Sequence, residues 1–220
     1  MKVPIEYGKY YHIYNRGNNY EDLFINEEDY LHFLFIYEIY ISSIADTFAW
    51  CLMKNHFHFL VRIKEEKEIG FLNSENIKSE DASVKWKTYF PDVQDKKFNK
   101  KPTPTNQFKH LFNAYTRWFN ISHDRISSLF EKNFKRKVIT NEKQLKNLIV
   151  YIHNNPVNHG FAESILEYPW TSYLELITQE PTILKRGQVL GYFDNVENFK
   201  FVHSLYSEKQ VEMINDFIVE

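Results

Sequence analysis

Residues 50–62 (WCLMKNHFHFLVR) constrain the fold of this chain more than any other stretch, because they place two histidines one residue apart in an apolar run. Alternate side chains of a strand point to opposite faces, so His56 and His58 share one face, with about 6.6 Å between their Cα atoms. Phe57 and Phe59 then face the other side, where apolar packing can hold the strand rigid. Neutral imidazole is a common ligand of divalent metals, so the pair is a candidate metal site. Two half-buried histidines with ordinary hydrogen bonds are the alternative.

The composition is that of an ordered chain without a strong overall charge. Hydrophobic residues make up 43% and aromatic residues 17% of its 220 residues, enough for one large domain or one domain with an appendage. Its 27 basic and 29 acidic residues give a net charge of −2, so a nucleic-acid site must be a local patch. The single cysteine, Cys51, excludes an internal disulfide and a zinc cage built from cysteines. Without a membrane-length apolar run or a signal-peptide core, we expect a cytoplasmic protein.

Hydrophobic periodicity predicts the order strand, helix, strand, strand, helix, strand. The expected elements are a strand at 10–14, a helix from Asn26 to about Ser43, strands at 47–53 and 56–63, a helix at 107–122 and a strand at 138–139. This βαββαβ order predicts a ferredoxin-like α+β fold, an antiparallel sheet with helices packed on one face. Capping-box patterns at 141–144 and 207–210 begin two further helices. We expect one domain at 1–173, with a polar insertion at about 64–106, and a C-terminal helical extension at 174–220.

Six motifs in sequence order resemble one known family. They are YHIYNRG at 11–17, CLMKNHFHFLV at 51–61, NAYTRWFN at 113–120, LF followed by FKRK at 129–137, YIHNNPVNHGF at 151–161 and YPWTSY at 168–173. This string resembles the REP-associated tyrosine transposases, relatives of the insertion-sequence transposases that have one catalytic tyrosine and a His-apolar-His motif. The insertion at 64–106 and the tail after residue 173 lie outside the matched pattern.

The resemblance implies cleavage and rejoining of single-stranded DNA beside a folded hairpin. His56 and His58 match the pair that in the family holds one Mg²⁺ or Mn²⁺ against the scissile phosphate. Tyr115 matches the nucleophile, whose oxygen attacks phosphorus to leave a 5′-phosphotyrosine and a free 3′-OH. It also lies on the apolar stripe of its predicted helix, so a core ring is the alternative. Tyr89 and Tyr151 are rival nucleophiles.

A third protein ligand is implied one turn from the tyrosine, where relatives carry Gln or Asn. Phe119 occupies that position here and cannot bind a metal. Asn120 is the candidate, although on an ideal helix it lies about 140° around from Tyr115, so the helix must distort or end there. Asn113 and water are the alternatives.

Basic side chains around the first and last strands are the expected DNA contacts. Relatives often carry an Arg in a Gly-Arg-Phe/Tyr string where this chain has Lys132-Asn133-Phe134, so the basic residues that follow are expected to supply the charge. The expected DNA-binding residues are Arg16, Lys132, Lys135, Arg136 and Lys137. A solvent-exposed turn is the alternative for Arg16, and a solvated edge strand for the basic run. His153 and Asn155 are interpreted as helix-end structure, because Pro156 is expected to stop the helix.

Three functions compete on these observations. The leading hypothesis is a metal-dependent transesterase acting on single-stranded or hairpin DNA, with no membrane partner. A homodimer with shared active sites is one of the arrangements this hypothesis allows. The second is a domesticated hairpin-DNA-binding or regulatory protein of the same fold without catalysis, favoured by the acidic balance. The third is a histidine-metal hydrolase of a small substrate, which would need acidic ligands that residues 50–62 do not provide.

Overall fold

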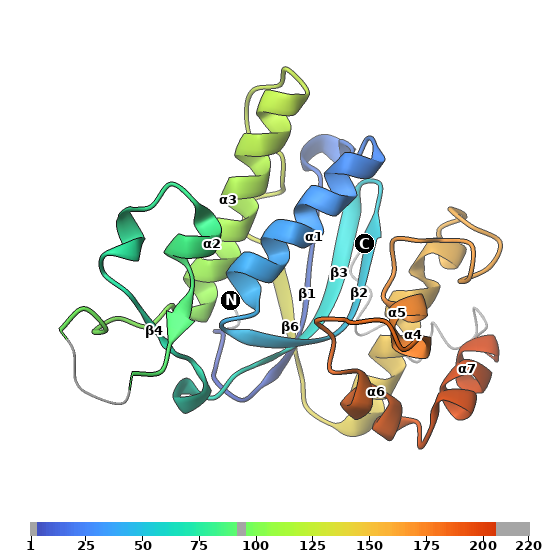
Figure 1. The fold of residues 1–220 in the computed structure, drawn as a ribbon. Coiled ribbons are helices and arrows are strands. Elements are labelled where there is room, and N and C mark those ends of the chain that lie inside the picture. Colours follow the sequence, from blue (N-terminus) through green and yellow to red (C-terminus); the bar gives the residue numbers. More distant parts are fainter. Residues whose placement is uncertain (1–3, 92–95, 206–220) are drawn as a thin grey trace.

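A four-stranded antiparallel sheet forms the centre of the computed structural model, which describes residues 4–91 and 96–205 (Figure 1). Its strand order is β2-β3-β1-β6, and neighbouring strands are antiparallel. The central elements are β1 (Tyr10–Arg16), α1 (Glu27–Ile41), β2 (Ala45–Met53), β3 (His56–Ile63), α3 (Pro104–Ser122) and β6 (Lys135–Ile139). The predicted ferredoxin-like βαββαβ fold is therefore confirmed.

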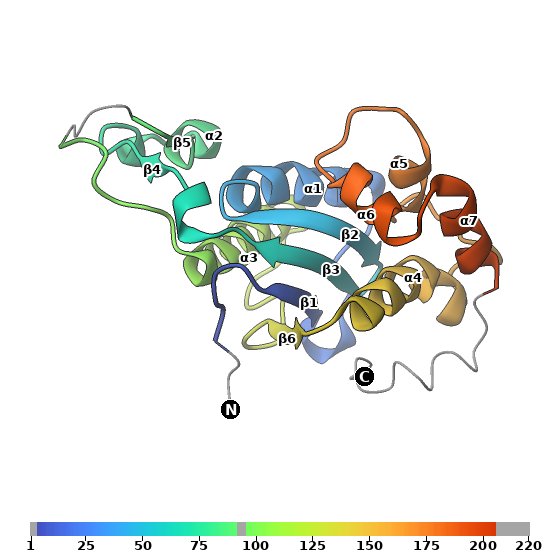
Figure 2. The same ribbon diagram turned by 90° about the horizontal axis from the view of Figure 1, so that it is seen from below.

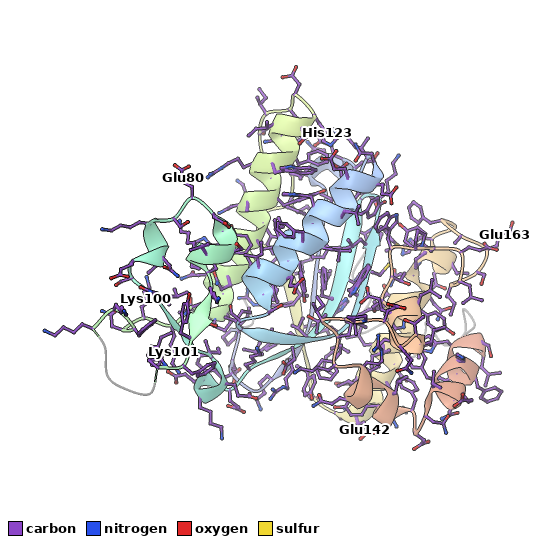
Figure 3. All side chains as sticks on the ribbon, viewed as in Figure 1. Glu80, Lys100, Lys101, His123, Glu142 and Glu163 are labelled. Carbon is purple, nitrogen blue, oxygen red and sulfur yellow. The ribbon has the colours of Figure 1, made fainter. Side chains whose placement is uncertain are left out.

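Helices α1 and α3 cover one face of the sheet. Asn26 caps α1 as predicted, because its side chain accepts a hydrogen bond from the Asp29 backbone N–H at 3.1 Å. The Asp29 carboxylate also lies 2.8 Å from Nε2 of His123, just past the end of α3, where Figure 3 labels it. On the same face of the sheet, the Phe57 ring of β3 packs 5.5 Å from Phe33 of α1 and 5.5 Å from Phe112 of α3. The predicted apolar stripe of α3 is buried there.

A further helix, α4 (Glu142–Asn158), packs on the opposite face of the sheet, against β2 and β3 (Figure 2). It begins after the N-cap Asn141, whose side chain accepts from the Gln144 N–H at 2.9 Å, as the capping pattern predicted. The expectation that Pro156 ends this helix is wrong. Proline lies in the last turn, where its missing N–H removes only one helical hydrogen bond, and the backbone N–H of His159 still bonds to Asn155 O.

The insertion forms a small unit beside α1 and α3. It contains η2 (Glu66–Glu68), β4 (Phe71–Leu72), η3 (Asn76–Lys78), α2 (Ala82–Lys85) and β5 (Thr88–Tyr89), and β4 pairs with β5. The Trp86 ring lies 5.9 Å from Tyr40 of α1 and 4.7 Å from His110 of α3. Trp86 therefore holds the insertion against both helices. Pro104 occupies the first turn of α3, so this helix begins three residues earlier than predicted.

The segment after α4 returns to β2 and then forms three short helices on the other side of the sheet from the insertion (Figure 1). The Leu52 N–H donates to Trp170 O at 2.9 Å, and the Ser172 N–H donates to Trp50 O at 3.0 Å. The helices are α5 (Tyr173–Ile177), α6 (Arg186–Tyr192) and α7 (Val196–Ser204). The helix predicted to begin at 207–210 lies outside the described residues, and the domain boundary at 173 stays a prediction. No described helix is both long and apolar enough to cross a membrane.

Candidate active site

His56 and His58 lie on the face of β3 that α4 covers, as strand alternation requires. Their ring centroids are 5.2 Å apart. Nδ1 of His56 lies 2.7 Å from Asn55 Oδ1 and must donate to it, which leaves the lone pair on Nε2. Burial lowers the pKa of His56 to about 3, with smaller contributions from His159 and Arg16. The imidazole is therefore neutral at pH 7, the form that binds metals.

A third histidine, His12 of β1, fixes the orientation of His58. Its Nε2 lies 2.8 Å from Nδ1 of His58, and the two rings stack at 5.0 Å between centroids. Burial, together with the charge of Lys137, lowers the pKa of His12 to about 3, and burial holds the pKa of His58 well below its ordinary value. A second partner of this kind sets the tautomer of a metal-binding histidine. Sequence reasoning missed His12, although its alternation with Tyr10 and Tyr14 in YYHIY was a usable signal.

Helix α4 presents two polar side chains to these histidines, Tyr151 and His159. The Tyr151 ring lies 5.8 Å from His58 and 6.5 Å from His12. The His159 ring lies 5.2 Å from His56. Asn155 lies between them on the same helical face and is fully buried. A cavity of about 580 Å³ opens here, lined by both site histidines, Tyr151, His159 and the cations Arg16 and Lys135, among others.

The prediction that the Tyr115 hydroxyl lies beside the two histidines is wrong. Tyr115 is fully buried between α1 and α3, on the other face of the sheet, where its hydroxyl donates to Leu23 O at 2.6 Å. Its ring packs against Phe33 and Phe24, at 4.9 and 5.7 Å. Burial raises the pKa of this phenol far above its ordinary value. The apolar stripe of α3 packs on the apolar face of β3, so its tyrosine cannot also face the histidines.

The predicted third ligand, Asn120, lies on the same helix as Tyr115 and not beside the two histidines. Asn120 lies on α3 and stabilises the loop that follows it: its Nδ2 donates to Ser127 O at 2.9 Å, and its Oδ1 accepts from Arg125 at 3.0 Å. The expectation that Asn120 binds a metal held by the histidines is therefore wrong. The alternative Asn113 is exposed on the same helix and lines a different cavity.

The five predicted DNA-binding residues divide between the two faces of the sheet. Lys135 and Lys137 pair across β1 with Tyr14 and His12, so both lie on the histidine face. Arg16 pairs with His56, and its guanidinium lies 4.8 Å from the centroid of the Tyr20 ring. Arg136 lies on the opposite face and lines a second cavity, while Lys132 is exposed and lines neither.

The side chains that could bind a metal here offer only imidazole nitrogen and amide oxygen atoms. Among residues 4–91 and 96–205, no group of three or more His, Cys, Asp or Glu side chains could hold a metal ion. In the same residues, Nε2 of His58 and Oδ1 of Asn155 are buried without a hydrogen-bond partner. Buried polar atoms are normally paired, so these two atoms fit a ligand. A hydrolase of small substrates would need carboxylate ligands, and no carboxylate of the described residues lines this cavity.

The fold and the site define a ferredoxin-like α+β domain with a cavity between two strand histidines and a helical tyrosine. No model of a protein family matches the chain. A Haemophilus influenzae (strain ATCC 51907 / DSM 11121 / KW20 / Rd) protein provisionally described as a REP-associated tyrosine transposase is 27% identical over 128 residues. The match covers 58% of this chain and 58% of that protein.

A solved structure shares the fold of this chain. It is a REP-associated tyrosine transposase bound to a REP hairpin, and it matches this chain with a TM-score of 0.56. The match covers 82% of this chain and 88% of that chain at 13% identity, so it concerns the fold alone. Together with the Haemophilus protein, it confirms the predicted resemblance of this chain to the REP-associated tyrosine transposases.

Proposed function

We propose that this protein cleaves and rejoins single-stranded DNA beside hairpins, with Tyr151 as the nucleophile and His56 and His58 as ligands of Mg²⁺ or Mn²⁺. The observation that carries the proposal is the convergence of a helical tyrosine and two neutral histidines on one cavity. Nucleophile and metal ligands must lie within reach of one phosphate, and of the three tyrosines considered, Tyr151 meets this condition.

The residues present fit a divalent cation. His56 and His58 would supply one nitrogen each, and Asn155 an amide oxygen, since two of these three donor atoms are buried and unpartnered among the described residues. When bound, Mg²⁺ or Mn²⁺ would neutralise charge on a non-bridging phosphate oxygen. His12 would keep the His58 ring in its tautomer, and Asn55 would do the same for His56.

Tyr151 would make the covalent bond. Its oxygen attacks phosphorus, the bond from phosphorus to the 3′ oxygen breaks, and that oxygen leaves as a free 3′-OH once it takes up a proton. The 5′-phosphotyrosine keeps the energy of the phosphodiester, so a 3′-OH can attack it and rejoin the strand without ATP. A phenol has a pKa near 10, and the Lys135 ammonium lining the same cavity would favour the phenolate.

The DNA partner is supported by local charge and by the comparisons. Arg16, Lys135 and Lys137 lie on the histidine face, so a chain of net charge −2 still presents a basic patch there. The structural neighbour is bound to a REP hairpin, and we extend that partner class, hairpin DNA, to this protein.

The test is a covalent-adduct assay with two matched tyrosine variants. The protein is incubated with hairpin oligonucleotides from its own genome and Mn²⁺, and adducts are separated on a denaturing gel. We expect an adduct with the parent protein and with Tyr115→Phe, and none with Tyr151→Phe or with His58→Ala. An adduct that survives Tyr151→Phe would refute the assignment of the nucleophile.

A second candidate is hairpin binding without catalysis, as in a domesticated regulatory protein. The observation that favours it is the burial of Tyr151, whose side chain is only 4% exposed and must become accessible to attack a phosphate. This candidate predicts salt-dependent binding of a hairpin with no adduct under any metal.

A further inference from the structure

The second half of the insertion and the start of α3 concentrate positive charge in one stretch of the chain. Residues 85–109 contain seven lysines against two aspartates, whereas the whole chain has a net charge of −2. A run of like charge is either a solvated surface or a binding surface for a polyanion. The arrangement of these lysines in the fold decides between the two.

Three of the lysines surround one histidine of α3. Partial burial lowers the pKa of His110, and the charges of Lys85, Lys100 and Lys109 lower it further. Lys85 ends α2, Lys100 lies on the insertion where Figure 3 labels it, and Lys109 belongs to α3. In the part of the chain that the structure describes, none of the three forms an ion pair. The fold therefore gathers positive charge from three elements and leaves it without a counter-charge.

Two further lysines are held on aromatic rings of the insertion. The Lys101 Nζ lies 4.9 Å from the centroid of the Phe71 ring, and the Lys87 Nζ lies 5.6 Å from that of Tyr89. Phe71 and Tyr89 are paired residues of β4 and β5. An ammonium group is attracted to the face of a ring, so both lysines are held near the small sheet. Less side-chain freedom is then lost when a ligand binds them. We call these two lysines, with Lys85, Lys100 and Lys109, the lysine surface.

Lys109 connects the lysine surface with the histidine cavity. It lines a cavity of about 1080 Å³ between α3 and residues 128–136. Tyr14, Asn15 and Lys135 line both that cavity and the histidine cavity, so the two adjoin. The insertion lies directly beside α3 (Figure 1). A long ligand held at the histidines can therefore also reach the lysine surface.

The form of the lysine surface favours duplex DNA over a single strand. No described residue of 64–103 lines either of these two cavities, so this part of the surface offers ammonium groups rather than slots for bases. Lysine contacts with phosphate fix the position of a duplex without reading its sequence. A duplex carries one negative charge per about 1.7 Å of its axis, about twice the density of one of its strands.

We infer that the lysine surface binds the phosphates of the double-stranded stem of the hairpin. The inference rests on the proposed function, because hairpin DNA is the partner class proposed there. The stem lies across the insertion while the cut is made at the histidines. The insertion adds affinity that depends on the length of the stem and not on its sequence.

Hairpins with stems of different length test the inference. Fluorescence anisotropy is measured in the Tyr151→Phe background, where no cleavage intervenes, with stems of about half a turn and about two turns of duplex. Lys87 and Lys100 are exposed and line neither cavity, so Lys87→Ala/Lys100→Ala should fold normally. We expect this double variant to bind the long-stem hairpin about 10- to 100-fold more weakly, with a slope of log K against log salt smaller by about 2. Its affinity for the short-stem hairpin should be unchanged.

The matched control is Lys143→Ala/Lys200→Ala, which removes two charges from exposed positions of α4 and α7 and should leave both affinities unchanged. Equal losses for the two stems, or no loss for the long stem, would overturn the inference and leave the proposed function standing if the parent protein forms its adduct. No binding of any hairpin would overturn both. A loss confined to the long stem, with no adduct in the parent, would support the lysine surface and refute the proposed catalysis.

Discussion

Acid should destabilise this protein through a buried histidine pair that joins α7 to α4. His203 Nδ1 donates to Phe199 O at 2.7 Å, so its Nε2 must accept from His153 Nδ1 at 2.9 Å. His153 Nε2 in turn lies 2.8 Å from the Ser172 hydroxyl, which donates to it. Every ring nitrogen in this chain of hydrogen bonds is used with both histidines neutral. A proton added to Nε2 of His203 would face the N–H of His153.

The size of the effect follows from the pKa values in the two states. Burial lowers the pKa of His203 to about 4, against about 6.5 for an unfolded histidine. Because the native pKa is depressed, the stabilisation is complete above pH 6.5 and is lost as the pH falls from 6.5 towards 4. At pH 5 the unfolded group is almost fully protonated and the native group is mostly neutral. His203 alone should therefore lower the free energy of unfolding by about 2 kcal/mol between pH 8 and pH 5.

Urea unfolding at pH 8, 6 and 5 measures this loss in the parent and in His203→Gln. Glutamine keeps a donor and an acceptor at this position but does not titrate. The variant should be less stable at pH 8, yet lose about 2 kcal/mol less than the parent on going to pH 5. Identical losses in the two proteins would refute the reasoning, because the titration would then lie elsewhere.

Three further substitutions test the cores on the two faces of the sheet. Tyr115→Phe should lower the free energy of unfolding by about 1–3 kcal/mol, because Leu23 O loses its buried donor, and chemical denaturation measures this; an unchanged stability would contradict the burial. Gln107→Leu should raise the melting temperature, because neither polar atom of this 1% exposed side chain has a partner among the described residues. A lower melting temperature would mean that the Gln107 amide forms hydrogen bonds in the folded protein. His12→Phe should weaken Mn²⁺ binding about 10- to 100-fold in calorimetry, because His58 loses its orienting partner, and unchanged affinity would exclude that role.

Local sequence patterns predicted most of the fold. Alternation in residues 56–63 fixed which side chains share a face of β3, and Asn26 and Asn141 marked the starts of two helices. These features depend on neighbours within a few residues, so the sequence displays them directly. The apolar stripe of α3 was also predicted correctly. The prediction was wrong only about the face of the sheet that this stripe covers.

The candidate site needed information that lies far apart in the sequence. Periodicity shows that Tyr115 shares a stripe with Phe108 and Phe119, but it does not say which face of the sheet the stripe covers. The usable signal was that an apolar stripe packs on the apolar side of β3, which excludes the histidine side. The i, i+4, i+8 spacing of Tyr151, Asn155 and His159 was a second signal. The predicted helix did not reach His159, because Pro156 was expected to end it.

Both outer edges of the sheet carry features that oppose sheet extension between molecules. The backbone of β2 is bonded on its outer side to residues 170–172, and to residue 185 through Thr47 O, so little of that edge can pair with another strand. At the other edge, β6 carries three consecutive basic residues, Lys135 to Lys137, and two such strands brought together would repel one another. A second copy of this protein would therefore have to dock through helices or loops, and strand-to-strand aggregation should be slow even at high concentration.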